Sequence, residues 1–399
     1  MKIVCVGGGP AGLYTALLAK LRAPALDVTV LERNARGATY GWGVVFWDDL
    51  LDTLHRNDRV SAGALRSAAN LWEGQEVWLP GGRMAHLGGY GFSIGRARLL
   101  EILTDRAVDL GVDVRFGCGS GAADDALAGA DVVVAADGVN SGLRERHRDE
   151  LGTELRLGGN WYIWLGTPRV FDAFTFAFAH TPAGWIWLHA YPSGGETSTC
   201  VVECPPSTWE GLGFADLDPE SSTALLTSIF AGHLGGEPLL DRAGLSAPAR
   251  WLRFRQVTNA RWYAGNVVLA GDAAHTTHFS VGAGTKLALE DAAAVAGRLT
   301  EPGGSVADVF AAYDVERREA LRPRQAAAQE SMEWFERLVV PDEADFVDFA
   351  YALWTRRGRY PAWRYRLHRA SQHDGFRRVR HEVSVARRSS RARRRERLG

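Results

Sequence analysis

The segment KIVCVGGGPAGLYTALL (residues 2–18) decides how this chain is expected to fold. Residues 2–6 form an apolar, β-branched run typical of a buried strand, and the residues after the glycines have helical spacing. A second apolar strand, residues 28–31, ends on Glu32, which lies 20 residues past Gly12. Strand, GxGxxG turn, helix, strand and acid, in this order, predict a dinucleotide-binding unit.

Each residue type in this turn has a physical task. Gly7 allows the tight turn, Gly9 lets the backbone approach a pyrophosphate, and Gly12 lets the helix pack close to the sheet. The helix N-terminus then directs free N–H groups and its positive dipole end at the phosphates. Glu32 would accept hydrogen bonds from ribose hydroxyls; the alternative is a glycine-rich turn in an ordinary α/β domain. The cofactor-binding residues predicted here are Gly7, Gly9, Pro10, Ala11, Gly12, Glu32 and Arg33.

Composition indicates an ordinary globular protein. The chain has 399 residues, 46% of them hydrophobic, and a formal net charge of −1. No apolar run approaches the 18 or more residues of a membrane-spanning helix, and the N-terminus lacks a cleavable leader, so we expect a cytoplasmic protein without membrane contact. Its four cysteines show no metal-ligand spacing, and we expect no metal site.

The middle of the chain differs in texture from its two ends. Apolar strands at 130–136 and 266–270 extend the first unit, whereas residues 155–254 hold four short, alternating, aromatic-rich strands separated by turn residues. This pattern predicts an α/β fold: a Rossmann-like domain with an inserted, mostly antiparallel sheet, followed by C-terminal helices. One aromatic face of that sheet is either core or the wall of a site for a flat ring.

Domain boundaries follow from these changes. We assign 1–85 and 86–154 to the first parts of the nucleotide domain and 155–260 to the sheet domain. Residues 261–300 are the segment in which the chain returns to the nucleotide domain. Helices are predicted over 48–71, from Ser93 to about residue 110, and over 285–299, with C-terminal helices over 301–375. Residues 376–399 are a basic tail, expected to be disordered.

The C-terminal region carries most of the positive charge. Residues 356–397 have a net charge of +13 in a chain whose total is −1. Two interpretations stay open: a solvated tail without a specific partner, or arginines that help hold a polyanionic ligand. No folded module accompanies the tail, so a nucleic-acid partner is not expected.

Two further motifs accompany the opening turn. The first is DGVNSGLR at 137–144, and the second is GDAAH at 271–275, followed by GAGT at 282–285 and a helix. In this order the three motifs resemble those of the single-component flavin-dependent aromatic hydroxylases of the p-hydroxybenzoate hydroxylase fold. The run HTTHFSVGAGTK (275–286) is similar to the branch of salicylyl-CoA 5-hydroxylase and anthraniloyl-CoA monooxygenase, which is related to the tryptophan-pigment hydroxylase of violacein biosynthesis. Phe279 and Lys286 replace a proline and an asparagine found in many members.

The resemblance implies FAD as cofactor, NADH or NADPH as electron donor and O2 as co-substrate, with oxygen transfer through a flavin hydroperoxide. It places the GD-motif aspartate near the ribityl chain, the DG motif at FAD and nicotinamide, and an arginine at the start of the helix before the DG strand. Physically, Gly282 and Gly284 let a helix N-terminus approach the flavin edge where negative charge develops. The further cofactor residues predicted on this basis are Arg96, Asp137, Arg144, Gly271, Asp272, Gly282, Ala283, Gly284 and Thr285.

The implied reaction is hydroxylation of an aryl-CoA thioester, with salicylyl-CoA to gentisyl-CoA as the main expectation. The alternatives are an indole or tryptophan-derived substrate, a carrier-protein-bound aromatic, a flavin protein without hydroxylase activity, and a halogenase, whose WxWxIP motif is missing. Oligomeric state is left as monomer or homodimer. The predicted catalytic residues are His278, Phe279 and His189, and the predicted substrate residues are Trp42, Val44, Tyr191 and Arg255.

Overall fold

A computed structural model describes residues 1–39, 41–118, 126–241, 248–340, 346–356, 358 and 361–397. Its first sheet has six strands in the order β15-β16-β9-β1-β2-β8. In this sheet β1 pairs in parallel with both β2 and β9. The predicted Rossmann-like domain is therefore confirmed. Its strands are β1 (Lys2–Val6), β2 (Asp27–Leu31), β8 (Asp113–Arg115), β9 (Val132–Ala135), β15 (Tyr263–Ala264) and β16 (Val267–Leu269).

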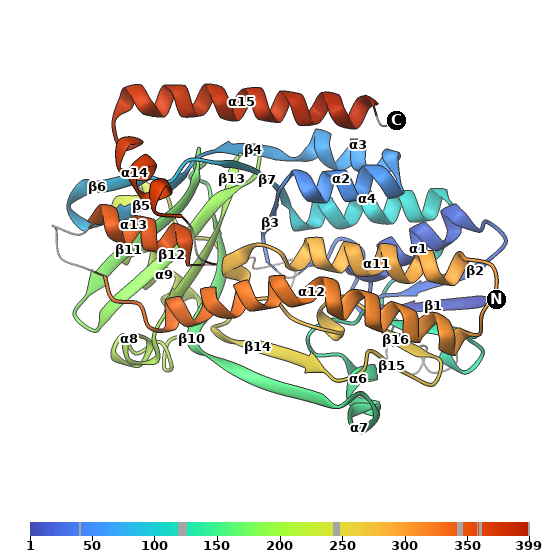
Figure 1. Ribbon diagram of the computed structural model, residues 1–399. Coiled ribbons are helices and arrows are strands. Elements are labelled where there is room, and N and C mark those ends of the chain that lie inside the picture. The colour runs from blue at the N-terminus through green and yellow to red at the C-terminus, as the bar shows by residue number, and fades with distance from the viewer. Residues whose placement is uncertain are drawn as a thin grey trace.

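Helices α1 (Pro10–Arg22), α4 (Arg96–Asp109), α11 (Gly284–Thr300) and α12 (Val306–Glu336) cover this sheet (Figure 1). Helix α1 packs against both α4 and α11, and α11 packs against α12. Leu13, Leu17 and Leu289 are among the buried residues of this core. These packed helices hold the first turn of α1 and the start of α11 at the same end of the sheet.

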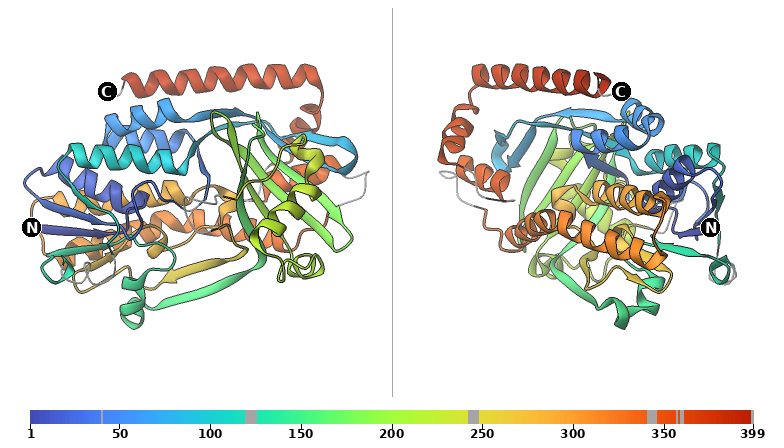
Figure 2. Two further views of the ribbon diagram at one scale, coloured as in Figure 1. Left: turned by 180° about the vertical axis from the view of Figure 1, so that it is seen from behind. Right: turned by 45° about the vertical axis from the view of Figure 1, so that its right-hand side comes forward.

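A second sheet of seven strands has the order β14-β10-β13-β12-β11-β5-β6. Figure 2 shows its green strands from two further sides. The four predicted aromatic strands are confirmed as an antiparallel set, while β5 joins the edge of β11 in parallel. Thus β5 and β6, which the sequence assigned to the segment 1–85, belong to this sheet. The strands are β5 (Gln75–Leu79), β6 (Arg83–His86), β10 (Thr153–Thr167), β11 (Phe174–Thr181), β12 (Gly184–Gly194), β13 (Thr197–Cys204) and β14 (Leu252–Asn259).

A small third sheet joins the two larger units. It consists of β3 (Gly43–Phe46), β7 (Tyr90–Gly95) and β4 (Asn70–Glu73). Ser93 therefore lies in a strand, and the helix predicted from it begins at Arg96 instead. The helix predicted over 48–71 is two helices, α2 (Asp48–Asn57) and α3 (Arg59–Ala68), because Asp58 leaves the helical conformation and caps α3.

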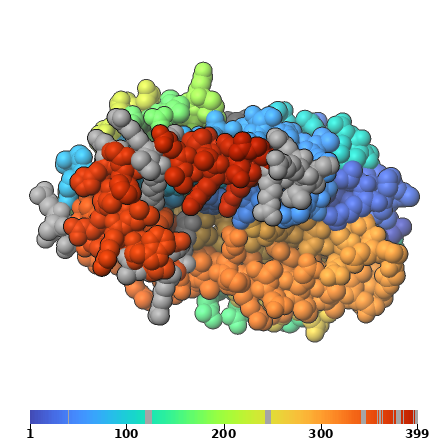
Figure 3. All heavy atoms as spheres, turned by 45° about the horizontal axis from the view of Figure 1, so that its top comes forward, coloured from blue at the N-terminus to red at the C-terminus, as the bar shows by residue number. Residues whose placement is uncertain are grey.

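The C-terminal region forms α13 (Phe346–Thr355), α14 (Ala362–Ala370) and α15 (Asp374–Arg397). The sequence predicted a disordered tail, whereas α15 is a helix that contacts α2. In Figure 3 the red atoms of the C-terminal region lie against the blue atoms of the N-terminal part. Its arginines meet acidic groups of the same chain: Arg388 pairs with Glu73, and Arg395 pairs with Asp48 and Asp52. Part of the tail's charge is thus used within the fold.

Short elements complete the structure. Within the described ranges, no helix is long and apolar enough to cross a membrane. The short elements are α6 (Gly142–Arg146), α7 (Arg148–Leu151), α8 (Pro206–Gly211), α9 (Pro219–Ile229), α10 (Ala231–Leu234), η1 (Pro80–Gly82), η2 (Gly271–Ala273) and η3 (Phe279–Val281).

Candidate active site

The glycine turn after β1 is tightly packed at two positions and open at the third. A Cβ built on Gly7, whose φ is +109°, would lie 2.3 Å from the carbonyl oxygen of Ala136. A Cβ on Gly12 would lie 2.0 Å from the carbonyl oxygen of Gly7, whereas a Cβ on Gly9 meets nothing within 4 Å. Gly7 and Gly12 therefore serve the fold, and Gly9 borders space that a ligand can occupy.

A pocket of about 580 Å³ adjoins this turn, lined by residues that include Gly9, Glu32, Thr39, Arg96 and Arg98. The carboxylate of Glu32 accepts hydrogen bonds from the backbone N–H groups of Gly8 (2.7 Å) and Asn34 (2.8 Å). These bonds hold Glu32 at the end of β2, on the pocket wall. Arg33 is exposed next to it.

Arg96 connects this pocket with the loop of the GD motif (residues 271–275), called the GD loop below. Its Nε donates to Thr39 Oγ1 at 3.1 Å, and its backbone N–H donates to the carbonyl oxygen of Trp42 at 2.9 Å. Asp272 is accessible, yet enough protein surrounds it that desolvation raises the pKa of its carboxyl, while the charges of His275 and Arg96 oppose this shift. Arg96 and Asp272, two of the predicted cofactor residues, therefore lie close enough for their charges to interact.

Asp137 and Arg144 belong to the DG motif (residues 137–144), called the DG loop below, and they hold this loop and the GD loop in place. The carboxylate of Asp137 accepts the backbone N–H of Gly142 at 2.8 Å. Arg144 is buried and donates to the carbonyl oxygens of Val139 (2.7 Å) and Ala273 (3.2 Å). Arg144 thus ties the DG loop to the GD loop.

Asp291 fixes the GD loop from below. Its carboxylate accepts hydrogen bonds from Gly271 N (3.0 Å), His275 Nε2 (2.8 Å) and Arg317 Nε (2.8 Å). Burial acts to raise the pKa of Asp291, but His275 and Arg317 outweigh it and lower that pKa. His275 therefore braces the loop.

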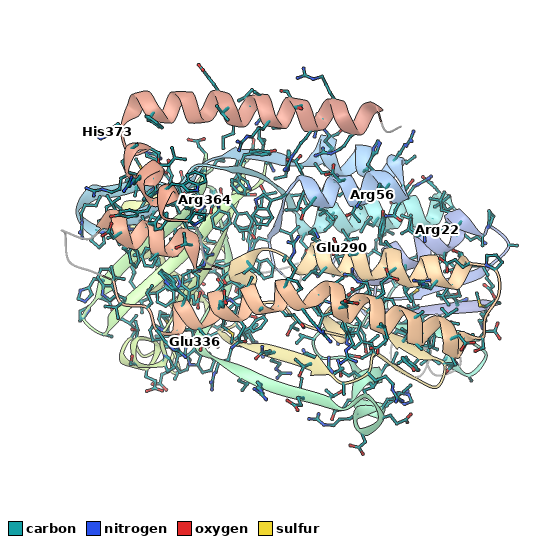
Figure 4. All side chains as sticks on the ribbon, in the orientation of Figure 1. Arg22, Arg56, Glu290, Glu336, Arg364 and His373 are labelled. Carbon is teal, nitrogen blue, oxygen red and sulfur yellow. The ribbon has the colours of Figure 1, made fainter. Side chains whose placement is uncertain are left out.

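Lys286 points to acidic neighbours rather than to open space. Its Nζ bonds the carboxylate of Glu290, the residue labelled on α11 in Figure 4, and lies 3.5 Å from Asp49 Oδ2. Arg317 also reaches Glu290 at 3.3 Å. The positive charge of Lys286 is therefore balanced within the protein.

The start of α11 is a second open N-terminus. Gly282 has φ +63°, and a Cβ there would lie 2.7 Å from the side chain of Val45. Ala283 is the N-cap residue and Thr285 is half-buried in the first turn. A Cβ on Gly284 meets nothing within 4 Å, so the first N–H groups of α11 can face a ligand.

These features fit FAD. The cradle open at Gly9, the carboxylates of Glu32 and Asp272, and the helix start at Gly284 supply groups suited to a pyrophosphate, to sugar hydroxyls and to an electron-accepting ring. Arg144 and Asp291 would hold the loops that carry these groups. When bound, FAD supplies the redox and oxygen chemistry, for which side chains alone are unsuited.

The predicted catalytic residues His278, Phe279 and His189 meet in one aromatic cluster. The ring centroid of Phe279 lies 4.2 Å from that of His278 and 5.7 Å from that of His189. The ring centroid of Tyr162 also lies 4.8 Å from that of Phe279. Because η3 and the second sheet contribute these rings together, the cluster presents flat apolar surface with two imidazoles.

Sequence reasoning missed Glu203, which is buried behind His189. Its carboxylate accepts from Asn160 Nδ2 (2.9 Å), Trp187 Nε1 (3.0 Å) and His189 Nε2 (3.2 Å). Burial alone would raise the pKa of Glu203. The hydrogen bond with His189 and the other polar contacts outweigh burial, so the pKa is lowered. The signal for it was a charged residue that lies on the same face of β13 as the buried Val201.

His278 is held through its Nδ1 atom. Ser280 Oγ lies 2.8 Å from this nitrogen and 2.8 Å from Ser331 Oγ, to which Arg356 Nε donates at 2.9 Å. Desolvation lowers the pKa of His278 to about 4, and the charges of His189 and Arg356 add to this effect against that of Glu203. Ser331 and Arg356 were also missed, because they lie 51 and 76 residues from Ser280.

Acid should destabilise the fold partly through His278. Between pH 6.5 and 4 the unfolded chain binds a proton at this residue that the folded chain does not, so stability falls as pH falls, by up to about 3 kcal/mol. Urea unfolding at pH 7 and pH 5 should show this loss in the wild type and a smaller loss in His278→Gln. Equal losses in both proteins would contradict it.

Of the four predicted substrate residues, Trp42, Val44 and Tyr191 lie around Gly43, whereas Arg255 contacts the loop of the DG motif. Trp42 packs flat on β10, where a Cβ on Gly166 would lie 2.4 Å from its ring, and Val44 is buried in the nucleotide-domain core. Tyr191 is buried and donates to the carbonyl oxygen of Gly43 at 2.8 Å. Arg255 is exposed and bonds Asn140 of the DG loop.

Fold and site together define an FAD-binding protein with a buried aromatic cluster that follows its GD motif. The model of the FAD binding domain family matches residues 1–328. The chain belongs to this family and, within it, to the flavin-dependent aromatic monooxygenases. Members of this group use FAD together with NAD(P)H and O2.

Three similar proteins illustrate the relationship. Salicyloyl-CoA 5-hydroxylase of Streptomyces sp. is 37% identical over 84% of this chain, which spans 65% of that protein's length. 3-Hydroxy-4-methyl-anthranilyl-[aryl-carrier protein] 5-monooxygenase of Streptosporangium sibiricum is 36% identical over 91% of this chain and 96% of that protein. The crystal structure of Pseudomonas aeruginosa PqsL in complex with 2-aminobenzoylacetate shares the fold, with a TM-score of 0.66 and 19% identity over 88% of this chain and 99% of that one.

Proposed function

We propose that this protein is an FAD- and NAD(P)H-dependent monooxygenase that hydroxylates the ring of an aryl-CoA thioester, with salicylyl-CoA to gentisyl-CoA as the first reaction to test. One observation carries the proposal: two relatives of similar identity are both named for oxygenation at position 5 of a ring whose acyl group is held by CoA or a carrier protein. Position 5 is para to position 2, which bears the hydroxyl of a salicylyl group and the amino group of an anthranilyl group. Either substituent makes that carbon electron-rich.

The chain's own residues bind, orient and exclude water. Phe279 and Tyr162 offer ring surfaces against which an aromatic acyl group can stack. His278 and His189 add polar contacts within an otherwise apolar cluster, and their burial keeps water out. The residues at Gly9, Glu32 and Asp272 would hold FAD, which supplies the oxygen chemistry.

A carrier-protein-bound aromatic is the second candidate. The carrier-protein monooxygenase is covered over 96% of its length, against 65% for the CoA hydroxylase, at nearly the same identity. The thioester chemistry is the same in both cases. The group that carries the thioester differs, because CoA adds phosphates to the pantetheine arm and a carrier protein adds a protein surface.

The proposal includes a cytoplasmic location, where NADH and acyl-CoA thioesters are available, a monomeric or homodimeric state, and no nucleic-acid partner. The test measures NADH consumption and product mass with salicylyl-CoA, with salicylyl-loaded carrier protein, with free salicylate and with tryptophan. We expect a gain of one oxygen only with a thioester. A gain with free salicylate or tryptophan alone would overturn the proposal, and the two thioesters decide between CoA and the carrier protein.

Removing the His278 imidazole should uncouple NADH use from hydroxylation, because a ring that is poorly oriented lets oxygen be reduced without transfer. We expect His278→Ala to form several-fold less product per NADH consumed. His180→Ala, at an exposed position on β11, is the matched control. Coupling near the wild-type value in His278→Ala would remove this residue from the mechanism.

A further inference from the structure

A row of hydrogen-bonded groups runs from Arg356 to His278. It passes through Ser331 on α12 and Ser280 on η3, with distances of 2.9 Å, 2.8 Å and 2.8 Å between neighbouring atoms. All four residues are buried, and Ser331 has no exposed surface. Three separate segments of the chain are therefore brought together at one nitrogen of one imidazole.

Two groups of the row can only donate hydrogen bonds: the guanidinium of Arg356 and the backbone N–H of Ser280. A guanidinium only donates hydrogen bonds, so Ser331 Oγ must accept from Arg356. The hydroxyl hydrogen of Ser331 is then available to Ser280, and that of Ser280 to His278 Nδ1. The backbone N–H of Ser280 also points at Nδ1, at 3.4 Å, and it too can only donate.

Arg356 is held in one position by further contacts. Its other nitrogens donate to the carbonyl oxygens of Leu353 and Ser280. Its guanidinium lies over the rings of Phe176 (5.3 Å) and Phe335 (5.1 Å). The starting point of the row is therefore a rigid, permanently charged donor.

We propose that Arg356, Ser331 and Ser280 hold His278 as a neutral imidazole with its hydrogen on Nε2, so that His278 donates a hydrogen bond to an acceptor oxygen of the substrate. The three residues are positioning residues, because they act through His278. The substrate part rests on the proposed function, in which the thioester carbonyl or an ionised phenol oxygen would be the acceptor.

The surroundings of Nε2 support this role. Within the described part of the chain, no hydrogen bond is formed by this nitrogen. Aromatic rings border the imidazole, with centroids of Phe254 at 4.8 Å and Phe279 at 4.2 Å. Accepting bonds at Nδ1 polarises the ring and strengthens Nε2–H as a donor. An Nε2–H donor bordered by aromatic rings suits a flat substrate that carries one hydrogen-bond acceptor.

The test reads the tautomer directly. Nitrogen-15 NMR of histidine-labelled holoenzyme, with His278→Gln used to assign the signal, should show protonated Nε2 and bare Nδ1 in the wild type. In Ser280→Ala and Ser331→Ala the signals should shift toward a mixture of tautomers. Ser93→Ala is the control, because Ser93 is buried on β7 and its hydroxyl has no partner among the described residues. Protonated Nδ1 in the wild type, or unchanged signals in both variants, would overturn the proposal.

The substrate part has its own readout. Ser280→Ala should lower kcat/KM for the preferred aryl thioester about tenfold and should reduce coupling, while Ser331→Thr, which keeps the hydroxyl, should stay near the wild type. A shifted tautomer with unchanged turnover and coupling would overturn this part only. A wild-type enzyme that hydroxylates no thioester would overturn the proposed function and leave the tautomer result standing.

Discussion

Gly9→Ala is expected to fold normally and to lose FAD. The backbone of Gly9 has φ −79° and ψ 179°, which alanine adopts without strain, and the added methyl group meets no protein atom within 4 Å. That space is where the turn would receive the pyrophosphate, so the methyl group should displace it. We expect FAD affinity to fall about 100-fold, equivalent to about 2.7 kcal/mol. Fluorescence titration of FAD into the deflavinated protein measures this loss.

The matched control is Gly12→Ala, which adds the same methyl group in the same turn. At Gly12 the new Cβ would lie 2.0 Å from the carbonyl oxygen of Gly7, so the turn itself must distort. Thermal unfolding should therefore show a large loss of stability in Gly12→Ala and little change in Gly9→Ala. Wild-type FAD affinity in Gly9→Ala would show that the cofactor does not approach this glycine.

Asp291→Ala is expected to destabilise the protein by about 3–5 kcal/mol, because it leaves the buried guanidinium of Arg317 without its closest carboxylate. The substitution also removes the acceptor for Gly271 N and His275 Nε2, so the GD loop loses two of its anchors. FAD affinity should fall with stability, since Asp272 follows Gly271 directly. Urea unfolding of the deflavinated protein separates the first effect from the second.

Asp113→Ala is the comparison for this experiment. Asp113 pairs with Arg115, and both side chains are about half exposed, so its loss should cost no more than about 1 kcal/mol. A similarly small loss in Asp291→Ala would show that Arg317 reaches another partner or water, and that the carboxylate is not what holds the GD loop.

Local patterns in the sequence were sufficient for the cofactor half of the protein. The turn at residues 7–12, the strand ends at Glu32 and Asp272, and the start of α11 were all placed correctly, since strand, turn and helix signals act over a few neighbouring residues. Edge strands were harder. The segment of β5 and β6 was assigned to the first domain because nothing in its own residues says that β5 pairs with β11, about a hundred positions later.

By itself, the sequence determined the dinucleotide fold, the glycine turn at residues 7–12 and the aromatic character of the second sheet, because each is encoded by the spacing of adjacent residues. Only the tertiary structure decided the polar partners of the site. Glu203 meets His189 across two strands, and Ser331 meets Ser280 from a helix 51 residues away. Such bonds depend on how the sheets and helices pack, and a buried polar group finds its partner only when that packing is complete.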